Sequence, residues 1–157
     1  MDKITVDKQI VIDFIERNGI TQKEFARIIG IGASPSNINN WIKGRERTPA
    51  WMPTMLESLK YYMEVNDMSL LAVKGEIQLR TPYNEDKIRE YLIRFQKRYK
   101  LKQSELAVLL GVSKSCIKHW EYGGVQKIPG WVKVLLFLLN ERKYVSHWKK
   151  KYIYDRQ

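Results

Sequence analysis

Apolar residues recur at intervals of three and four along most of the chain, the spacing of one face of an α-helix. They do so in two series of four short segments, one series in each half of the chain. The first series lies near residues 10–15, 22–30, 35–44 and 49–63, and the second near residues 85–99, 103–111, 114–123 and 129–139. The pattern predicts an all-α protein.

Helix starts and ends in these segments carry the residues that cap helices. Thr21 and Glu24 have the spacing of a capping box, in which each satisfies the backbone N–H of the other. Lys102 stands where the second series would need such a cap, and a lysine side chain cannot accept that hydrogen bond. Other expected starts are Ser34 with Pro35, Thr48 with Pro49, Asn84 and Ser113, and expected ends are Gly30, Gly44 and Gly111.

Between the two series, residues 67–83 form an expected linker without a clear helical pattern. Within it, EIQLR at 76–80 alternates like a β-strand. We therefore expect an N-terminal domain at 1–66 and a C-terminal domain at 84–143, followed by a tail at 144–157. Nearly every position of the segment 131–139 is apolar, with Lys133 as the exception. We therefore expect it to pack both on its own domain and on a second surface, either the other domain or a second copy of the chain.

The two series are copies of each other. TQKEFARIIGIGASPSNINNWIKG aligns with KQSELAVLLGVSKSCIKHWEYG at an offset of 81, which becomes 79 after a two-residue insertion in the first copy. The offset is 80 further on, where Pro49, Trp51 and Leu56 meet Pro129, Trp131 and Leu136. Offsets that change only between helices are those that loop insertions produce, which indicates an internal duplication.

The charge of the chain is unusual for its size. Of 157 residues, 28 are Lys or Arg and 17 are Asp or Glu, which gives a net charge of +11. Residues 1–75 carry a net charge of +1 and residues 76–157 a net charge of +10. Such an excess favours polyanionic partners, nucleic acid first and an anionic membrane second.

Several function classes find no support in the sequence. The single Cys116 excludes an internal disulfide and fits a reducing cytoplasm, and the longest apolar stretch, 131–139, is too short to span a membrane. His119 has only His147 and Cys116 as companions, so no metal site is expected. Without a phosphate loop, nucleophile triad or carboxylate pair, we expect a soluble cytoplasmic protein that is not an enzyme and needs no cofactor.

The second and third segments of each copy suit a helix-turn-helix. Ala26 and Ala107 are small enough for the two helices to cross closely. In the third segment, Ile38 and Trp41, or Ile117 and Trp120, supply the core face. The opposite face carries side chains that can reach base edges: Ser36, Asn37, Asn39, Asn40 and Lys43 in copy one, and Lys114, Ser115, Lys118 and His119 in copy two.

On these residues both copies resemble the Cro and lambda-repressor-like (XRE-like) helix-turn-helix family. The shared pattern is a Gln that opens the second helix, then E-[FL]-A, a Gly turn and I-x-x-W, and the likeness covers residues of about 10–65 and 88–143. The resemblance implies two tandem units of four to five helices, each with one helix in the major groove. Base-reading roles then fall on Pro35, Ser36 and Asn40, and on Lys114, Ser115 and His119. Phosphate-binding roles fall on Gln22, Gln103, Arg45, Arg47 and Lys127. Pro35 and the inserted Gly32-Ala33 depart from the family pattern.

The sequence thus predicts a sequence-specific regulator of transcription that binds double-stranded DNA. A repressor or autoregulator would be typical, since stand-alone proteins of this family often serve phages and mobile elements in that way. The alternatives are an antitoxin-like protein that holds a protein partner and an RNA-binding regulator. A monomer would prefer two unlike half-sites and a homodimer four, with the half-site spacing left open by the linker. The basic, aromatic tail (Lys149, Lys150, Lys151, Trp148, Tyr152 and Tyr154) would bind phosphates or pack on the body.

Overall fold

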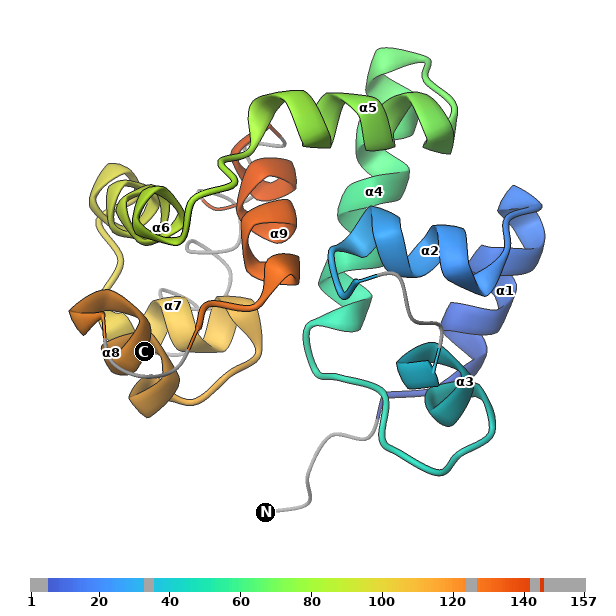
Figure 1. Ribbon diagram of the computed structural model, residues 1–157, viewed down its shortest axis with the longest axis horizontal. Helices are drawn as coiled ribbons and strands as arrows, with labels where there is room; N and C mark the ends of the chain where they lie inside the picture. Colours follow the sequence, from blue (N-terminus) through green and yellow to red (C-terminus); the bar gives the residue numbers. More distant parts are fainter. Residues whose placement is uncertain (1–5, 33–35, 124–126, 142–144, 146–157) are drawn as a thin grey trace.

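The computed structural model describes residues 6–32, 36–123, 127–141 and 145, and every regular element in this part of the chain is an α-helix (Figure 1). The fold is therefore all-α, as the apolar spacing predicts. The helices are α1 (Gln9–Asn18), α2 (Gln22–Ile29), α3 (Ser36–Ile42), α4 (Met52–Asn66), α5 (Leu70–Arg80), α6 (Glu85–Arg98), α7 (Gln103–Leu110), α8 (Lys114–Tyr122) and α9 (Gly130–Glu141).

The predicted caps explain where α2, α6 and α8 begin. The Thr21 hydroxyl accepts a hydrogen bond from the Glu24 N–H at 3.1 Å, and the Glu24 carboxylate accepts one from the Thr21 N–H at 3.2 Å. The side chains of Asn84 and Ser113 cap α6 and α8 by accepting hydrogen bonds from the N–H groups of Asp86 and Cys116. At Lys102 only half of the capping box forms, because the lysine side chain offers no acceptor. The half that forms is a hydrogen bond from the backbone N–H of Lys102 to the Glu105 carboxylate at 2.8 Å.

Two sequence predictions about element positions are wrong. The fourth helix begins at Met52, three residues after Pro49, with Trp51 at the N-cap and Pro53 in the first turn. The segment 76–80 is not a strand but the last part of α5. Ser69 caps this helix, and Leu70, Val73 and Ile77 bury one helical face, so packing decides where the short alternating pattern was ambiguous.

Helix contacts in the first half of the chain recur in the second. Helix α1 packs against α3 and α4, and α6 packs against α8 and α9. Helix α2 packs against α3 as α7 does against α8. Helix α5 crosses one end of the molecule and touches both α4 and α9, which lie together at the centre (Figure 1).

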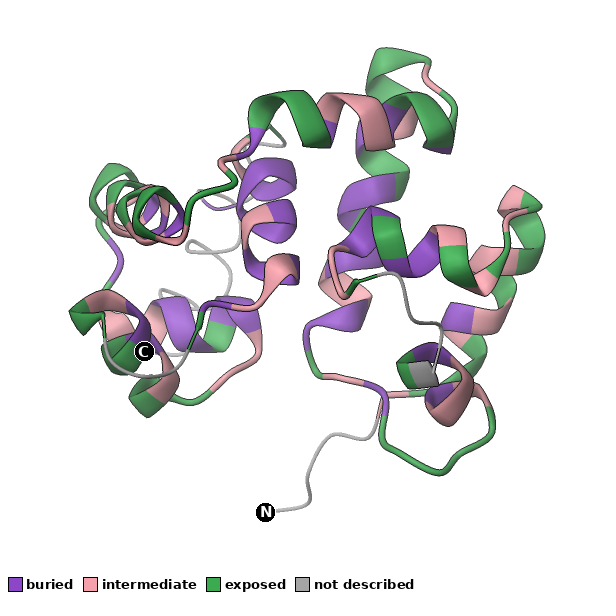
Figure 2. Cartoon of the chain, in the orientation of Figure 1, coloured by how far each residue is buried: buried purple, intermediate pink, exposed green. Residues whose placement is uncertain are grey.

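Helix α9 is the most buried element of the structure (Figure 2). Phe137 is 3% and Leu138 is 1% exposed. The helix packs on α6 of its own half and on α2, α4 and α5, and the ring of Phe137 lies 5.6 Å from that of Tyr62. The prediction that this helix packs on two surfaces is confirmed, and the second surface is the other half of the chain.

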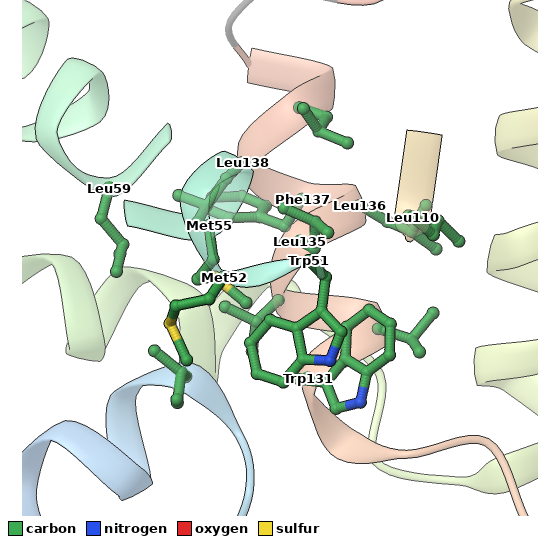
Figure 3. Close-up of a cluster of buried hydrophobic side chains, with 14 of the residues drawn as sticks. Trp51, Met52, Met55, Leu59, Leu110, Trp131, Leu135, Leu136, Phe137 and Leu138 are labelled. Carbon is green, nitrogen blue, oxygen red and sulfur yellow. The ribbon is translucent and has the colours of Figure 1, made fainter. Parts of the chain in front are cut away.

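Tryptophan rings join the two halves at the start of α4 and α9. Trp51 and Trp131 stack with ring centroids 4.4 Å apart and planes 10° from parallel, at the edge of the cluster of buried side chains in Figure 3. Because one hydrophobic core runs from α1 to α9, the domain boundaries at residues 66 and 84 stay a prediction.

Lys133 is the one basic residue of α9. Its ammonium group donates a hydrogen bond to the Pro82 carbonyl at 3.1 Å and lies 5.5 Å from the centre of the Tyr83 ring. Burial lowers the pKa of Lys133, because the charged form loses water. These contacts hold the end of the expected linker against α9, so the segment 67–83 is packed on both halves and does not hang free between them.

Of the tail, Val145 is fully buried in the core, and the remaining residues, 144 and 146–157, lie outside the described part of the chain. The role predicted for its lysines therefore stays a prediction. None of the helices in the described segments is long and apolar enough to cross a membrane.

Candidate nucleic-acid interface

Helices α7 and α8 form a compact helix-turn-helix pair in the second half of the chain. The turn is Gly111-Val112-Ser113, three residues long, and the two helices pack directly on each other. Ala107 is buried at the crossing, and Ile117 and Trp120 turn inward from α8. The core face that the sequence assigns to this helix is confirmed.

Helices α2 and α3 form the matching pair in the first half. Ala26 and Ile38 are fully buried and Trp41 is nearly so, which confirms the predicted inward face of α3. Pro35 and the side chain of Ser36, two of the positions assigned to base reading, lie outside the described part of the structure.

The other predicted contact residues lie on α2, α3, α7 and α8 or in the segments that follow α3 and α8, and none of them is buried. Exposed residues are Asn37, Lys43, Arg45, Arg47, Lys114, Ser115, Lys118, His119 and Lys127. Half-buried residues are Gln22, Asn39, Asn40 and Gln103. Helices α3 and α8 lie at the same end of the molecule, at the lower right and lower left of Figure 1, opposite α5. The fold therefore leaves two polar helix faces available to one extended partner.

Backbone hydrogen bonds hold the basic segment that follows α3 close to the helix end. The Asn40 carbonyl accepts hydrogen bonds from the N–H groups of Arg45 at 2.8 Å and Glu46 at 3.2 Å. The backbone of Arg45 therefore lies within hydrogen-bonding distance of the backbone of Asn40. The neighbouring Glu46 is exposed and adds a negative charge beside Arg45. This places an amide that suits adenine and a guanidinium that suits phosphate on the same edge of the copy-one pair.

Gln103, a predicted phosphate contact, has an acidic neighbour that the sequence analysis does not identify. Its side-chain amide donates a hydrogen bond to a carboxylate oxygen of Glu121 at 2.7 Å, and the other oxygen of Glu121 is buried without a hydrogen-bond partner. Position 121 aligns with Ile42 in the first copy, so this contact belongs to copy two alone. One of the two amide hydrogens of Gln103 is thus already engaged.

Arg89 on α6 is a second residue that the sequence analysis misses. Its Nε donates a hydrogen bond to the carbonyl of Trp120 at 2.9 Å, close to the C-terminal end of α8, and its Nη1 meets the Asp86 carboxylate at 3.1 Å. A cation is favourable at this end of a helix, where unpaired carbonyls gather. Its counterpart at the offset of 81 is Lys8, whose Nζ lies 3.7 Å from the position of a Cβ on Gly44, at the end of α3. The repeat alignment could have identified this position, since Lys8 and Arg89 align and both are basic.

We predict that Arg89→Ala lowers the free energy of unfolding by about 1–2 kcal/mol, because it removes a charge-assisted hydrogen bond to a partly buried carbonyl. Chemical denaturation measures the change. Lys87→Ala, an exposed position on the same helix, serves as the control and should stay within about 0.5 kcal/mol of the parent. Equal losses in the two variants would contradict the role of Arg89 at the end of α8.

The described residues contain no group of three or more His, Cys, Asp or Glu side chains that could hold a metal ion.

No protein-family model, curated protein or solved structure matches the chain significantly.

Proposed function

We propose that the protein is a sequence-specific regulator of transcription that binds double-stranded DNA through α3 and α8. The observation that carries the proposal is the pair of short polar helices at one end of the molecule, each held by a neighbouring helix and buried along its opposite face. A single helix of this kind fits the major groove, which is the only groove that displays a distinct pattern for each base pair.

The chemistry of the exposed faces supports the same partner. Asn40 offers an amide, which can bind adenine through two hydrogen bonds, and Lys114 and Lys118 offer ammonium groups that can bind guanine or phosphate. Exposed Arg45, Arg47 and Lys127 follow the two helices along the chain and add positive charge beside them. Phosphate contacts from such flanking cations set the register of a protein on a duplex.

The proposal is tested with the full chain and a library of random duplexes. Duplexes retained over repeated rounds should share a sequence, and the chain should bind that sequence about 10³-fold or more tightly than a scrambled duplex at physiological salt. Fluorescence anisotropy of labelled duplexes measures the affinities for the selected and scrambled sequences, and competition with a structured RNA measures the preference for DNA over RNA.

The outcomes separate the candidate functions. Equal affinity for selected and scrambled duplexes would contradict sequence-specific regulation. Stronger binding to structured RNA would favour an RNA-binding regulator. The absence of binding to either nucleic acid would favour an antitoxin-like protein with a protein partner. On the proposed function, the selected sequence should also occur upstream of the gene for the protein, as repression of its own operon requires.

We predict that Asn40→Ala weakens binding to the selected duplex by about 1–3 kcal/mol, because adenine loses its two-point contact. Binding to the scrambled duplex should stay unchanged, since an amide adds nothing to the attraction between charges. Titration of both duplexes with each protein measures the difference. A loss of equal size on both duplexes would show that Asn40 does not read a base.

A further inference from the structure

The contact between the two halves pairs residues with their own counterparts in the repeat. Trp51 aligns with Trp131 at the offset of 80, and these two rings stack on each other. A residue that contacts its own counterpart lies on the axis that relates the two copies. The stack therefore marks the position of an approximate two-fold axis between α4 and α9.

Contacts on either side of this stack are reciprocal. Gly30 lies against Gly130, where an added Cβ on Gly30 would stand 2.6 Å from the Gly130 carbonyl oxygen. Gly111 lies against Ala50 and Trp51, where an added Cβ would stand 2.9 Å from the Trp51 nitrogen. Gly111 is the counterpart of Gly30, and Ala50 is the counterpart of Gly130. Contact of residue i with j, together with contact of their counterparts in exchanged roles, is the signature of a two-fold interface.

Two further tryptophans continue the pattern to the polar helices. Trp41 of α3 meets Trp51 edge to face at 6.3 Å and 84°, and Trp120 of α8 meets Trp131 at 6.3 Å and 76°. Trp41 and Trp120 are counterparts at the offset of 79. Four rings thus form one chain of contacts from α3 to α8, with the two-fold axis at its middle.

We infer that one chain has the architecture of a two-fold dimer and binds one duplex as a monomer, at two unlike half-sites in inverted orientation, about one helical turn apart. This inference rests on the proposed function and adds to it the form of the DNA site.

The inverted orientation follows from the symmetry of the two partners. A DNA duplex has two-fold axes perpendicular to its own axis, and a protein with a matching axis places its two reading helices on half-sites that run in opposite directions. Two heads on a flexible tether would accept direct and inverted repeats alike. Here α4 and α9 pack together and α5 touches both, so the orientation of α3 relative to α8 is set by the fold.

The spacing follows from the tryptophan chain. The ring centroids of Trp41 and Trp120 cannot be further apart than the three distances 6.3, 4.4 and 6.3 Å laid end to end. The reading face lies across each helix from its tryptophan, so about 10 Å, the diameter of a helix, is added at each end. The resulting upper limit is far short of two turns of DNA, about 70 Å, and accommodates one turn, about 34–36 Å. The two helices therefore suit successive major grooves on one face of the duplex.

The half-sites differ in sequence because the two helices present different side chains. Helix α3 carries Asn37, Asn39 and Asn40, and α8 carries lysines and a histidine at the aligned face, among them Lys118 and His119. Asparagine favours adenine, whereas lysine favours guanine. The chain should thus bind its site in one direction only.

The test uses the full chain and four versions of the selected duplex. Version one is unchanged, version two carries about five extra base pairs between the half-sites, version three carries about ten, and version four has one half-site reversed in place. We expect one chain per duplex by analytical ultracentrifugation, and a loss of about 100-fold or more in affinity for each of the other three versions.

The version with about ten extra base pairs separates a fixed arrangement from a tethered one. It restores the phase of the helix but moves one half-site a full turn away, which independent heads on a tether would reach and a fixed pair would not. Recovery of affinity on this version, tolerance of the reversed half-site, or two chains on one duplex would overturn the inference and leave the proposed function intact. Failure to select any duplex sequence would overturn the proposed function itself.

Discussion

Gly111→Ala should destabilise the protein by about 2–5 kcal/mol, because an added methyl group there brings both backbone strain and overlap with the other half of the chain. Gly111 has a positive φ of 69°, a conformation that costs an L-residue about 1–2 kcal/mol. A Cβ there would also stand 2.9 Å from the backbone nitrogen of Trp51 and 3.0 Å from the carbonyl carbon of Ala50. These are backbone atoms at the start of α4, so they cannot move aside as the end of a flexible side chain could. Forced overpacking of this kind costs about 1–3 kcal/mol more.

The chain offers a matched control for the conformational part of this cost. Gly19 has a φ of 60° and ends α1, and no atom lies within 4 Å of the position of its Cβ. Gly19→Ala should therefore lose only about 1–2 kcal/mol. The difference between the two variants, measured by urea denaturation, reports the contact between the halves. Equal losses would mean that Gly111 matters only as the end of α7.

Removal of both Lys114 and Lys118 should weaken binding to every duplex by about 10- to 100-fold. Each lysine that neutralises a phosphate releases a counterion, so the double alanine variant should also reduce the slope of log affinity against log salt by about two. The loss should be at least as large on the selected duplex as on the scrambled one, because Lys118 can also bind guanine there. Copy two is expected to dominate here because residues 76–157 carry +10 of the net charge.

Lys60→Ala with Lys74→Ala removes the same charge from α4 and α5 and is the control for this prediction. Helix α5 and the C-terminal half of α4, where Lys60 lies, are toward the end of the molecule opposite α3 and α8 (Figure 1). This pair should change affinity by less than about threefold and leave the salt slope unchanged, since its charges lie beyond the reach of a bound phosphate backbone. Equal effects of the two pairs would indicate that net charge alone attracts the duplex.

The parts of the fold that the sequence predicts well are those that depend on neighbours within four residues. The capping box of Thr21 and Glu24 and the Ser113 cap form as expected, because every atom of these contacts lies within one turn. The burial of Trp41 and Trp120 was predictable too, since each follows an isoleucine by one helical turn.

The parts that depend on distant neighbours were not predictable in the same way. The alternating pattern of residues 76–80 also suited a β-strand, but this segment is part of helix α5. The helix is stable because Val73 and Ile77 are buried where α5 packs on other helices. The apolar segment 131–139 signalled that it needs a second surface, but nothing in its residues distinguished the other half of the chain from a second molecule.

The candidate interface shows the same division. The exposure of Lys114, Lys118 and His119 follows from the period of α8 and was predicted. The contacts of Gln103 with Glu121 and of Arg89 with the Trp120 carbonyl join residues 18 and 31 positions apart. Such contacts need the crossing geometry of the helices, which the helical pattern of each segment alone does not contain.

The stacking of Trp51 on Trp131 within one polypeptide affects how binding depends on protein concentration and how the two halves of a binding site can evolve. A contact inside one chain forms at any protein concentration, whereas two subunits must first meet, which makes occupancy of a site depend on the square of a low concentration. A fused pair would respond to gene dosage in simple proportion. On the proposed function, a mutation in α3 would alter recognition of one half-site and spare the other. The two half-sites could then change independently during evolution, which the half-sites of a homodimer cannot do.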